Sequence, residues 1–291
     1  MIKANWKENA IKIIITVAAS TSILIVALIF FFIVREAVPF VKEPGLAKLF
    51  NSRWVPTSLL SPSFGIWPLF TGSLLITVLA TLIAVPFGVI GAIYISEIAN
   101  SREREILKPF IELLAGIPSV VLGFFGMIVL SPVIKYLFNL PSGLTALTGA
   151  LLLALMAIPT IISISEDAIR GVPLSYKEAA LGLGASRLQT IWKVTVPAAL
   201  SGINAAVMLG IGRVIGETMT VLMVTGNAAM VTLSPFDSVR TMTATIAAEM
   251  GEVPFGSEHY SALFCIGFVL LLITFGLNLA AQRTLKRYRK V

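Results

Sequence analysis

One arginine and one glutamate interrupt an otherwise apolar run of the sequence. They are Arg213 and Glu217, within GIGRVIGETMTVLMVTGN at residues 210–227. An arginine at the centre of a membrane helix costs about 2.5 to 3.5 kcal/mol on insertion scales, so such a residue usually has a function. Its planar guanidinium matches two oxygens of an oxyanion. If the run is one continuous helix, the four-residue spacing places both side chains on one face, about 6 Å apart, where they can pair.

The two charges predict a weak anion-binding site inside a membrane. Glu217 would hold Arg213 in place while the path is empty, and it would repel the anion enough to keep binding reversible. A purely structural pair at a subunit contact is the alternative. Gly212 and Gly216 permit the close helix approach that either interpretation needs.

A second informative segment is a loop of about thirty residues, 166–197, which reads EDAIRGVPLSYKEAALGLGASRLQTIWKVTVP. A simple connector needs only a few residues. The composition predicts a short helix at 176–181, a glycine break and a second short helix at 186–193. Ala179 and Ala180 would keep this unit narrow enough to enter a groove on a partner. An amphipathic surface loop without a partner is the alternative.

The elements that must position these segments are membrane spans. Hydrophobic residues make up 57% of the 291-residue chain and charged residues 13%, whereas soluble domains carry about 25% charged residues. Apolar stretches of 18 residues or more predict transmembrane helices. The six expected spans are 13–34, a segment within 66–95, a segment within 111–130, 144–165, 199–224 and 262–281. We expect bent helices at Pro86, Pro118 and Pro159.

The distribution of basic residues predicts the orientation. With the N-terminus inside, most of the 22 Lys and Arg residues fall in inner segments, as the positive-inside rule requires. Both termini are therefore expected in the cytoplasm, the loop 166–197 inside, and the loops 35–65 and 226–260 outside. Within the second outer loop, residues 240–250 have helical composition and are expected to lie on the membrane surface or to dip into it.

Several classes of function are excluded by residue type. Cys265 and His259 are the only cysteine and histidine, so an intrachain disulfide and a His-rich metal site are not expected. Gly216-Glu217-Thr218 lacks the lysine of a phosphate-binding P-loop, and no GxxxxGK[ST] motif occurs. No catalytic residue set, metal site, cofactor or basic nucleic-acid-binding face is evident. The chain is therefore not expected to be an enzyme.

The inner loop resembles the EAA loop of ABC importer permeases. Glu178-Ala179-Ala180, three residues, Gly184, nine residues and the sequence at 194–197 reproduce the spacing of that motif. Val194 and Val196 replace its Ile and Leu. The resemblance implies an all-α polytopic membrane protein with six transmembrane helices and the type I ABC importer permease (MetI-like) fold. It also implies that Glu178, Ala179, Ala180 and Gly184 dock on a cytoplasmic ATPase.

The chain also resembles the phosphate-specific permeases of the PstC type. The resemblance is carried by GRVIGETM with VTGN, by ELLAGIPSVVLGFFG at 112–126, and by the segments 64–97 and 240–252. Met219 favours PstC over the related PstA. The resemblance implies import of inorganic phosphate past Arg213 and Glu217. The implied partners are a PstA-like permease, two PstB-like ATPases and an extracytoplasmic PstS-like phosphate-binding protein in the cell membrane.

The predicted organisation is an N-terminal span and outer loop at 1–65, followed by the permease core at 66–291. Three alternatives remain. The first is the same machine for another oxyanion, such as sulfate or molybdate. The second is an ion-coupled secondary transporter with Arg213 and Glu217 as its coupling pair, although such proteins usually show internal repeats. The third is a membrane scaffold without transport.

Overall fold

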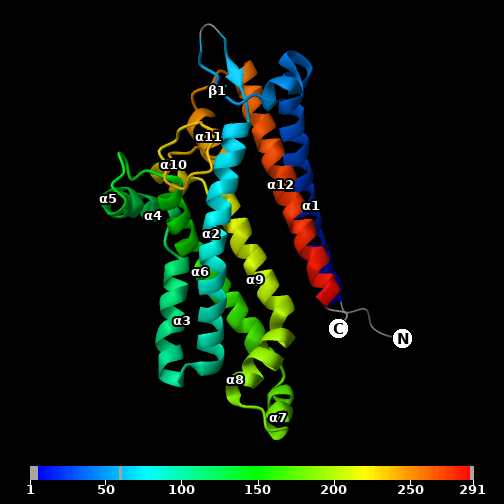
Figure 1. The fold of residues 1–291 in the computed structure, drawn as a ribbon. Helices are drawn as coiled ribbons and strands as arrows, with labels where there is room; N and C mark the ends of the chain where they lie inside the picture. The colour runs from blue at the N-terminus through cyan, green and yellow to red at the C-terminus, as the bar shows by residue number, and fades with distance from the viewer. Residues whose placement is uncertain (1–5, 59–60, 289–291) are drawn as a thin grey trace.

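Long apolar helices run along most of the molecule in a computed structural model of the chain (Figure 1). The structure describes residues 6–58 and 61–288, with the side chains of residues 8–58 and 61–279. The long helices are α1 (Trp6–Phe40), α2 (Trp67–Ile93), α6 (Ala146–Arg170), α9 (Val196–Gly216) and α12 (Glu258–Tyr288). The shorter helices are α3 (Ser101–Ala115), α4 (Ser119–Phe125), α5 (Ser131–Leu137), α7 (Leu174–Gly182), α8 (Arg187–Thr190), α10 (Met219–Val224) and α11 (Met242–Glu249).

Short helical turns and one small hairpin complete the architecture. The turns are η1 (Val41–Gly45), η2 (Leu46–Phe50), η3 (Tyr94–Ile98), η4 (Gly126–Leu130) and η5 (Ile191–Thr195). The hairpin pairs β1 (Trp54–Val55) antiparallel to β2 (Ser63–Phe64). Several turns continue a neighbouring helix, so η3 extends α2 and η5 joins α8 to α9.

In the described part of the chain, six helical segments are long and apolar enough to cross a membrane, which confirms the predicted number of spans. They are Glu8–Phe50, Trp67–Ile98, Ser119–Leu137, Ala146–Arg170, Arg187–Gly216 and Glu258–Leu279. The predicted bounds of the third and fifth spans are wrong, because each predicted stretch contains a helix break. One break separates α3 from α4 at residues 116–118, and the other separates α9 from α10 at residues 217–218.

The first break has a local cause. Pro118 has no N–H to donate, and its ring would occupy the place of a carbonyl in the preceding helical turn. Its backbone is extended, at φ −59° and ψ 138°, and α4 begins at the next residue. Pro86 and Pro159, by contrast, remain inside uninterrupted stretches of α2 and α6. The two breaks adjoin each other, since the Thr220 hydroxyl donates to the Ser119 carbonyl at 3.1 Å.

Helix α6 is the central helix and packs closely against both α2 and α9. A Cβ added at Gly88 of α2 would lie 2.6 Å from Cγ2 of Ile161, and one at Gly210 of α9 would lie 2.6 Å from its Cγ1. Ile161 is fully buried in α6. Because neither glycine has a side chain, both helices approach the same isoleucine, and the three helices form one tightly packed unit.

At one end of the molecule, a carboxylate joins the hairpin to the helices. The indole Nε1 of Trp54 donates to both oxygens of Glu249, at 3.1 and 3.0 Å. Arg240 Nη1 lies 2.6 Å from this carboxylate and His259 Nε2 lies 2.8 Å from it. Glu249 is the last residue of α11, which confirms the predicted helix within residues 240–250.

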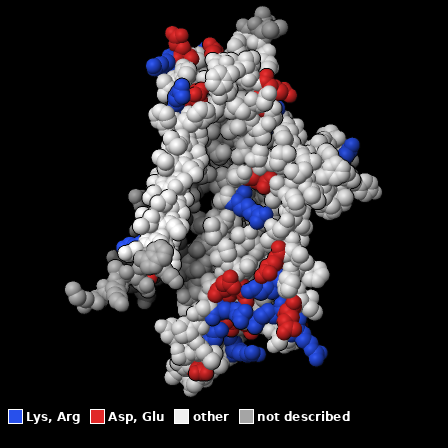
Figure 2. All heavy atoms as spheres, turned by 180° about the vertical axis from the view of Figure 1, so that it is seen from behind, with Lys and Arg blue, Asp and Glu red and all other residues white. Residues whose placement is uncertain are grey.

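The opposite end carries α7, α8 and the turn from α2 to α3. Figure 1 shows that α1 begins and α12 ends in the same half of the molecule, above the level of α7. A chain that crosses the membrane an even number of times has both of its ends on the same side. Charged side chains gather at both ends, and most of the surface between them carries no charge (Figure 2).

Candidate functional site

Arg213 lies in the last turn of α9, where its guanidinium contacts two other segments. Nη1 donates to the hydroxyl of Thr160 in α6 at 3.2 Å, and Nη2 donates to the carbonyl of Ala115, the last residue of α3, at 3.4 Å. The side chain is half-buried. The last carbonyl of α3 is therefore directed toward this cation, which itself belongs to the last turn of α9. The negative end of a helix dipole stabilises a positive charge.

The predicted pairing of Arg213 with Glu217 is wrong. Among the described side chains, residues 8–58 and 61–279, no carboxylate forms an ion pair with Arg213. The reason is the backbone. Helix α9 ends at Gly216, and Glu217 is extended at φ −69° and ψ 133°. The four-residue spacing faces two side chains toward each other only while the helix continues.

Glu217 instead stabilises the helix break between α9 and α10. Its Oε1 accepts the backbone N–H of Thr220 at 3.1 Å, in the first turn of α10. Its own carbonyl accepts the Thr243 hydroxyl from α11 at 2.8 Å. A carboxylate that bonds a first-turn amide satisfies one of the unpaired donors of the helix. Glu217 thus connects α9, α10 and α11 at the level of Arg213.

This arrangement leaves Arg213 with unused capacity to bind an anion. A guanidinium has five N–H donors, and the neutral groups Thr160 and Ala115 accept from two of its nitrogens. Neither acceptor cancels its charge. Figure 2 shows charge at mid-height of the molecule, in a hollow between the two charged ends. An arginine whose partners are neutral and leave donors free suits the oxygens of an oxyanion.

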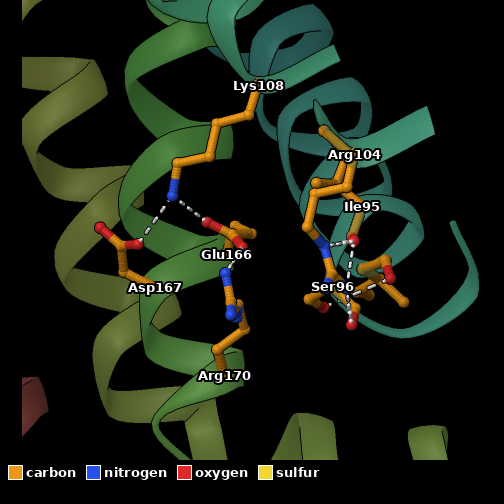
Figure 3. A network of polar contacts seen from close by, with 8 residues as sticks. Ile95, Ser96, Arg104, Lys108, Glu166, Asp167 and Arg170 are labelled. Atoms are coloured by element: carbon orange, nitrogen blue, oxygen red, sulfur yellow. Dashed lines mark hydrogen bonds and ion pairs between the residues drawn. The ribbon is translucent and has the colours of Figure 1, made fainter. Parts of the chain in front are cut away.

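A second group of charged residues, which sequence reasoning missed, lies between α3 and the last turns of α6 (Figure 3). Lys108 Nζ of α3 lies 2.8 Å from Glu166 Oε2 and 3.4 Å from Asp167 Oδ1, both in α6. Arg170 Nη1 lies 3.3 Å from Glu166 Oε1. The Glu166 side chain is 2% exposed. The hydrogen bond from Lys108 to Glu166 raises the pKa of Lys108 above its ordinary value. Desolvation by burial lowers this pKa, but by less.

A sequence signal for part of this group exists. Glu166 and Arg170 stand four residues apart at the end of an apolar span, a spacing typical of a helical ion pair. Lys108 stands 58 positions away from Glu166, so only the fold brings these two together. Arg104 completes the group, with its guanidinium donating to the carbonyls of Ile95 and Ser96 at 2.7 to 3.0 Å.

The two predicted helices of the inner loop are present as α7 and α8. Gly184 follows α7 with φ +85°, a conformation that glycine adopts without strain. Ala185 N–H donates to the Ala180 carbonyl at 3.1 Å and Gly184 N–H to the Leu181 carbonyl at 2.9 Å. These two bonds form a Schellman motif. The predicted glycine break is therefore the C-terminal cap of α7.

The four predicted coupling residues do not all face outward. Glu178 and Ala179 are exposed, whereas Ala180 is buried against the chain itself. Large apolar side chains are exposed around them, with Leu183 at 90% and Leu174 at 66%. Lys177 pairs with Glu97 at the end of η3, which fastens α7 to α2. The surface left free on α7 and α8 therefore combines large apolar side chains with the carboxylate of Glu178 and the exposed cation of Arg187.

The fold and its sequence define an inner-membrane permease of binding-protein-dependent transport systems. Residues 84–290 match the family model described as the binding-protein-dependent transport system inner membrane component, and the chain belongs to this family. It is a multi-pass membrane protein. The predicted fold, all-α with six transmembrane helices and the type I ABC importer permease (MetI-like) architecture, is confirmed.

Its relatives are permease subunits. The chain is 43% identical over 243 residues to the probable ABC transporter permease protein YqgH of Bacillus subtilis, covering 84% of this chain and 78% of the relative. It is 34% identical over 262 residues to the phosphate transport system permease protein PstC of Mesorhizobium japonicum, covering 84% and 79%. It is 32% identical over 306 residues to PstC 2 of Mycobacterium tuberculosis, covering 97% and 93%.

Two solved transporters share the fold. A bacterial alginate ABC transporter, in complex with a periplasmic protein that holds an alginate pentasaccharide, aligns with a TM-score of 0.68 at 15% identity, covering 98% of each chain. The MetNI methionine ABC transporter in an inward-facing conformation aligns with a TM-score of 0.57 at 18% identity, covering 77% of this chain and 94% of the other. These likenesses concern the fold alone.

Proposed function

We propose that this chain is the permease subunit through which an ATP-driven importer moves inorganic phosphate across the cell membrane. The observation that carries the proposal is Arg213, a half-buried cation that the described side chains leave without a carboxylate partner, beside two helix breaks. The phosphate transport names of its relatives support the substrate. A guanidinium recognises phosphate through paired oxygens.

Arg213 and Glu217 have different parts in the proposed path. Arg213 binds the passing phosphate with donors that its neutral partners do not occupy. Glu217 holds the bend between α9 and α10 through the Thr220 amide, so that Arg213 keeps its place at the end of a helix. A negative charge close to the path also weakens phosphate binding, and a conduit needs its substrate to leave.

The exposed unit formed by α7 and α8 is the proposed contact with a cytoplasmic ATPase. Glu178 and Ala179 would meet the ATPase, while Ala180 and Gly184 would shape and cap the helix that presents them. The exposed Leu174 and Leu183 support a groove-binding role, because an apolar helix face gains free energy when a groove covers it. Motion of the ATPase would reach α2 through Lys177 and Glu97.

The proposed assembly has the partners that this class of transporter requires. They are a second, PstA-like permease, two PstB-like ATPases inside and a PstS-like phosphate-binding protein outside. With both termini in the cytoplasm, α7 lies inside and the hairpin of β1 and β2 outside, because α1 begins in the half of the molecule that carries α7. Residues 66–291 would form the transport core, with the coupling loop at 166–197, and residues 1–65 an added span and outer loop.

The proposal is tested by phosphate uptake into proteoliposomes that contain all four components, with each omitted in turn. Uptake should require every component and ATP, and excess sulfate or molybdate should compete poorly. Uptake that persists without the ATPase would indicate an ion-coupled carrier and would overturn the proposal. Equal competition by sulfate would reassign the substrate while leaving the class of transporter in place.

A further inference from the structure

We infer that the ion pair of Lys108 and Glu166 is a positioning device, which holds α3 so that its last carbonyl orients Arg213. The inference rests on the proposed function of Arg213, but the contact that it describes does not. Neither residue belongs to the proposed phosphate path, and both lie outside α7 and α8, which form the proposed ATPase contact. The pair joins α3 to the last turns of α6 (Figure 3).

The first step is that packing alone holds α3 weakly. None of the residues of α3 is buried, and only Leu107 and Ile111 reach a neighbouring apolar cluster, as partly buried members. A helix with so little covered apolar surface gains little free energy from burial. Specific polar contacts must therefore supply much of what fixes α3 relative to α6.

The second step is that these polar contacts lie on one side of α3. Arg104 binds the carbonyls of Ile95 and Ser96, which fastens the first turns of α3 to the end of η3. Lys108, one turn further, binds Glu166 in α6. Because Glu166 is almost wholly buried and Lys108 only one-third exposed, this pair is screened far less than a surface pair. The longer bond to the exposed Asp167 contributes less.

The third step links the Lys108–Glu166 ion pair, called the clamp below, to Arg213. Ala115, whose carbonyl accepts from Arg213, lies seven residues beyond Lys108 in the same helix, or about 10 Å along its axis. The helix contains Pro109, which removes one backbone hydrogen bond of the turn before Lys108, but it continues as one helix to Ala115, so a change of tilt at Lys108 reaches its last residue. Loss of the clamp would therefore displace the Ala115 carbonyl and free the guanidinium from one of its two orienting contacts.

The clamp also stands beside the proposed coupling helix. Lys177 of α7 pairs with Glu97 of η3, and Arg104 of α3 binds two other residues of the same turn. The turn η3 thus contacts both α7 and α3. A displacement of α7 reaches α3 through this turn, and the Lys108–Glu166 pair determines how much of it reaches Ala115.

The test measures position and transport separately. Cys265, the only cysteine, is replaced by alanine, and spin labels are placed at Leu113 of α3 and Leu209 of α9, which are both exposed. In the assembled transporter, Glu166→Gln and Lys108→Met should each shift or broaden the distance between the labels, and Lys108→Arg should restore it. The Michaelis constant for phosphate should rise about tenfold in the first two variants, with ATPase affinity unchanged.

Asp167→Asn is the matched control, because it removes a neighbouring negative charge that also faces Lys108. It should alter neither the label distance nor the Michaelis constant. An unchanged distance in both Glu166→Gln and Lys108→Met would overturn the inference. An altered distance with no phosphate uptake by the parent transporter would instead overturn the proposed function and leave the clamp in place.

A chemical measurement checks the pair itself. Because the bond to Glu166 raises the pKa of Lys108, less of its amine is uncharged at a given pH below that pKa, so acylation by acetic anhydride at pH 8.5 should be slow. Glu166→Gln should accelerate the labelling of Lys108, measured by mass spectrometry, while other lysines react at their former rates. Equal rates in the two proteins would show that the pair does not form.

Discussion

The guanidinium of Arg213 and the hydroxyl of Thr160 lie 3.2 Å apart, and this bond joins α9 to α6. Thr160 directly follows Pro159, so the cation is held beside a proline of the central helix. Its second acceptor, the Ala115 carbonyl, belongs to the end of α3. Three helices thus determine where the cation lies, and each offers a separate way to disturb it.

Removal of the threonine hydroxyl should weaken transport while the fold is kept. Thr160→Val preserves the shape of the side chain but removes a bond to a charged group, so kcat/KM for phosphate should fall about tenfold. Thr274→Val is the control, because the Thr274 hydroxyl bonds only to carbonyls of its own helix, α12. Equal uptake by the two variants in reconstituted vesicles would contradict the role of Thr160.

Removal of the cation should have a larger effect. Arg213→Gln keeps some hydrogen-bonding capacity but loses the charge, and uptake of labelled phosphate should fall at least about thirtyfold, with the complex still assembled. Arg213→Lys should retain part of the activity, since a lysine supplies the charge without the paired donors. Near-normal uptake by Arg213→Gln would show that phosphate passes elsewhere.

A charge reversal on α7 should separate the membrane subunit from its ATPase. Glu178→Arg should lower the recovery of the ATPase in a pull-down about tenfold, with insertion into the membrane unchanged. Glu252→Arg provides the same reversal at an exposed position just after α11, at the opposite end of the molecule. Recovery that is unchanged by Glu178→Arg, or reduced equally by both, would argue against this contact.

The cap of α7 should be sensitive to a single methyl group. Gly184→Ala meets no neighbouring atom but places a side chain at φ +85°, which costs about 1 to 2 kcal/mol. Gly182→Ala also meets open space, inside the helix and without a positive φ, and should be tolerated. Phosphate-driven ATPase activity should therefore fall in Gly184→Ala alone. A matching loss in both variants would mean that side-chain bulk matters, not the conformation of residue 184.

The sequence allowed the main features of the fold and of both sites to be predicted, for reasons that lie in local residue types. Arg213 and Glu217 are conspicuous because charge is rare in an apolar span. Gly184 could be recognised as a helix end because glycine favours the left-handed conformation. Pro118 is also a local signal, but a proline alone predicts a bend inside a longer span, and here the helix breaks.

Other features depend on contacts between distant residues. No proline stands at Glu217, and its extended backbone is accompanied by a bond from Thr243, 26 positions along the chain. The pairing with Arg213 was therefore predicted from a helix that does not continue. Lys108 and Glu166 belong to different helices, and Ala180 was expected on the free surface although the fold covers it. Tertiary packing decided each of these positions.

The contact of Ile161 with Gly88 and Gly210 limits how such a protein can change shape. Any sliding of α2 or α9 along α6 would carry the glycines away and drive a neighbouring side chain into the isoleucine. We therefore expect α2, α6 and α9 to move together as one rigid body. Opening and closing of a passage then depend on the connections around these three helices, among them the helix breaks at Pro118 and Glu217.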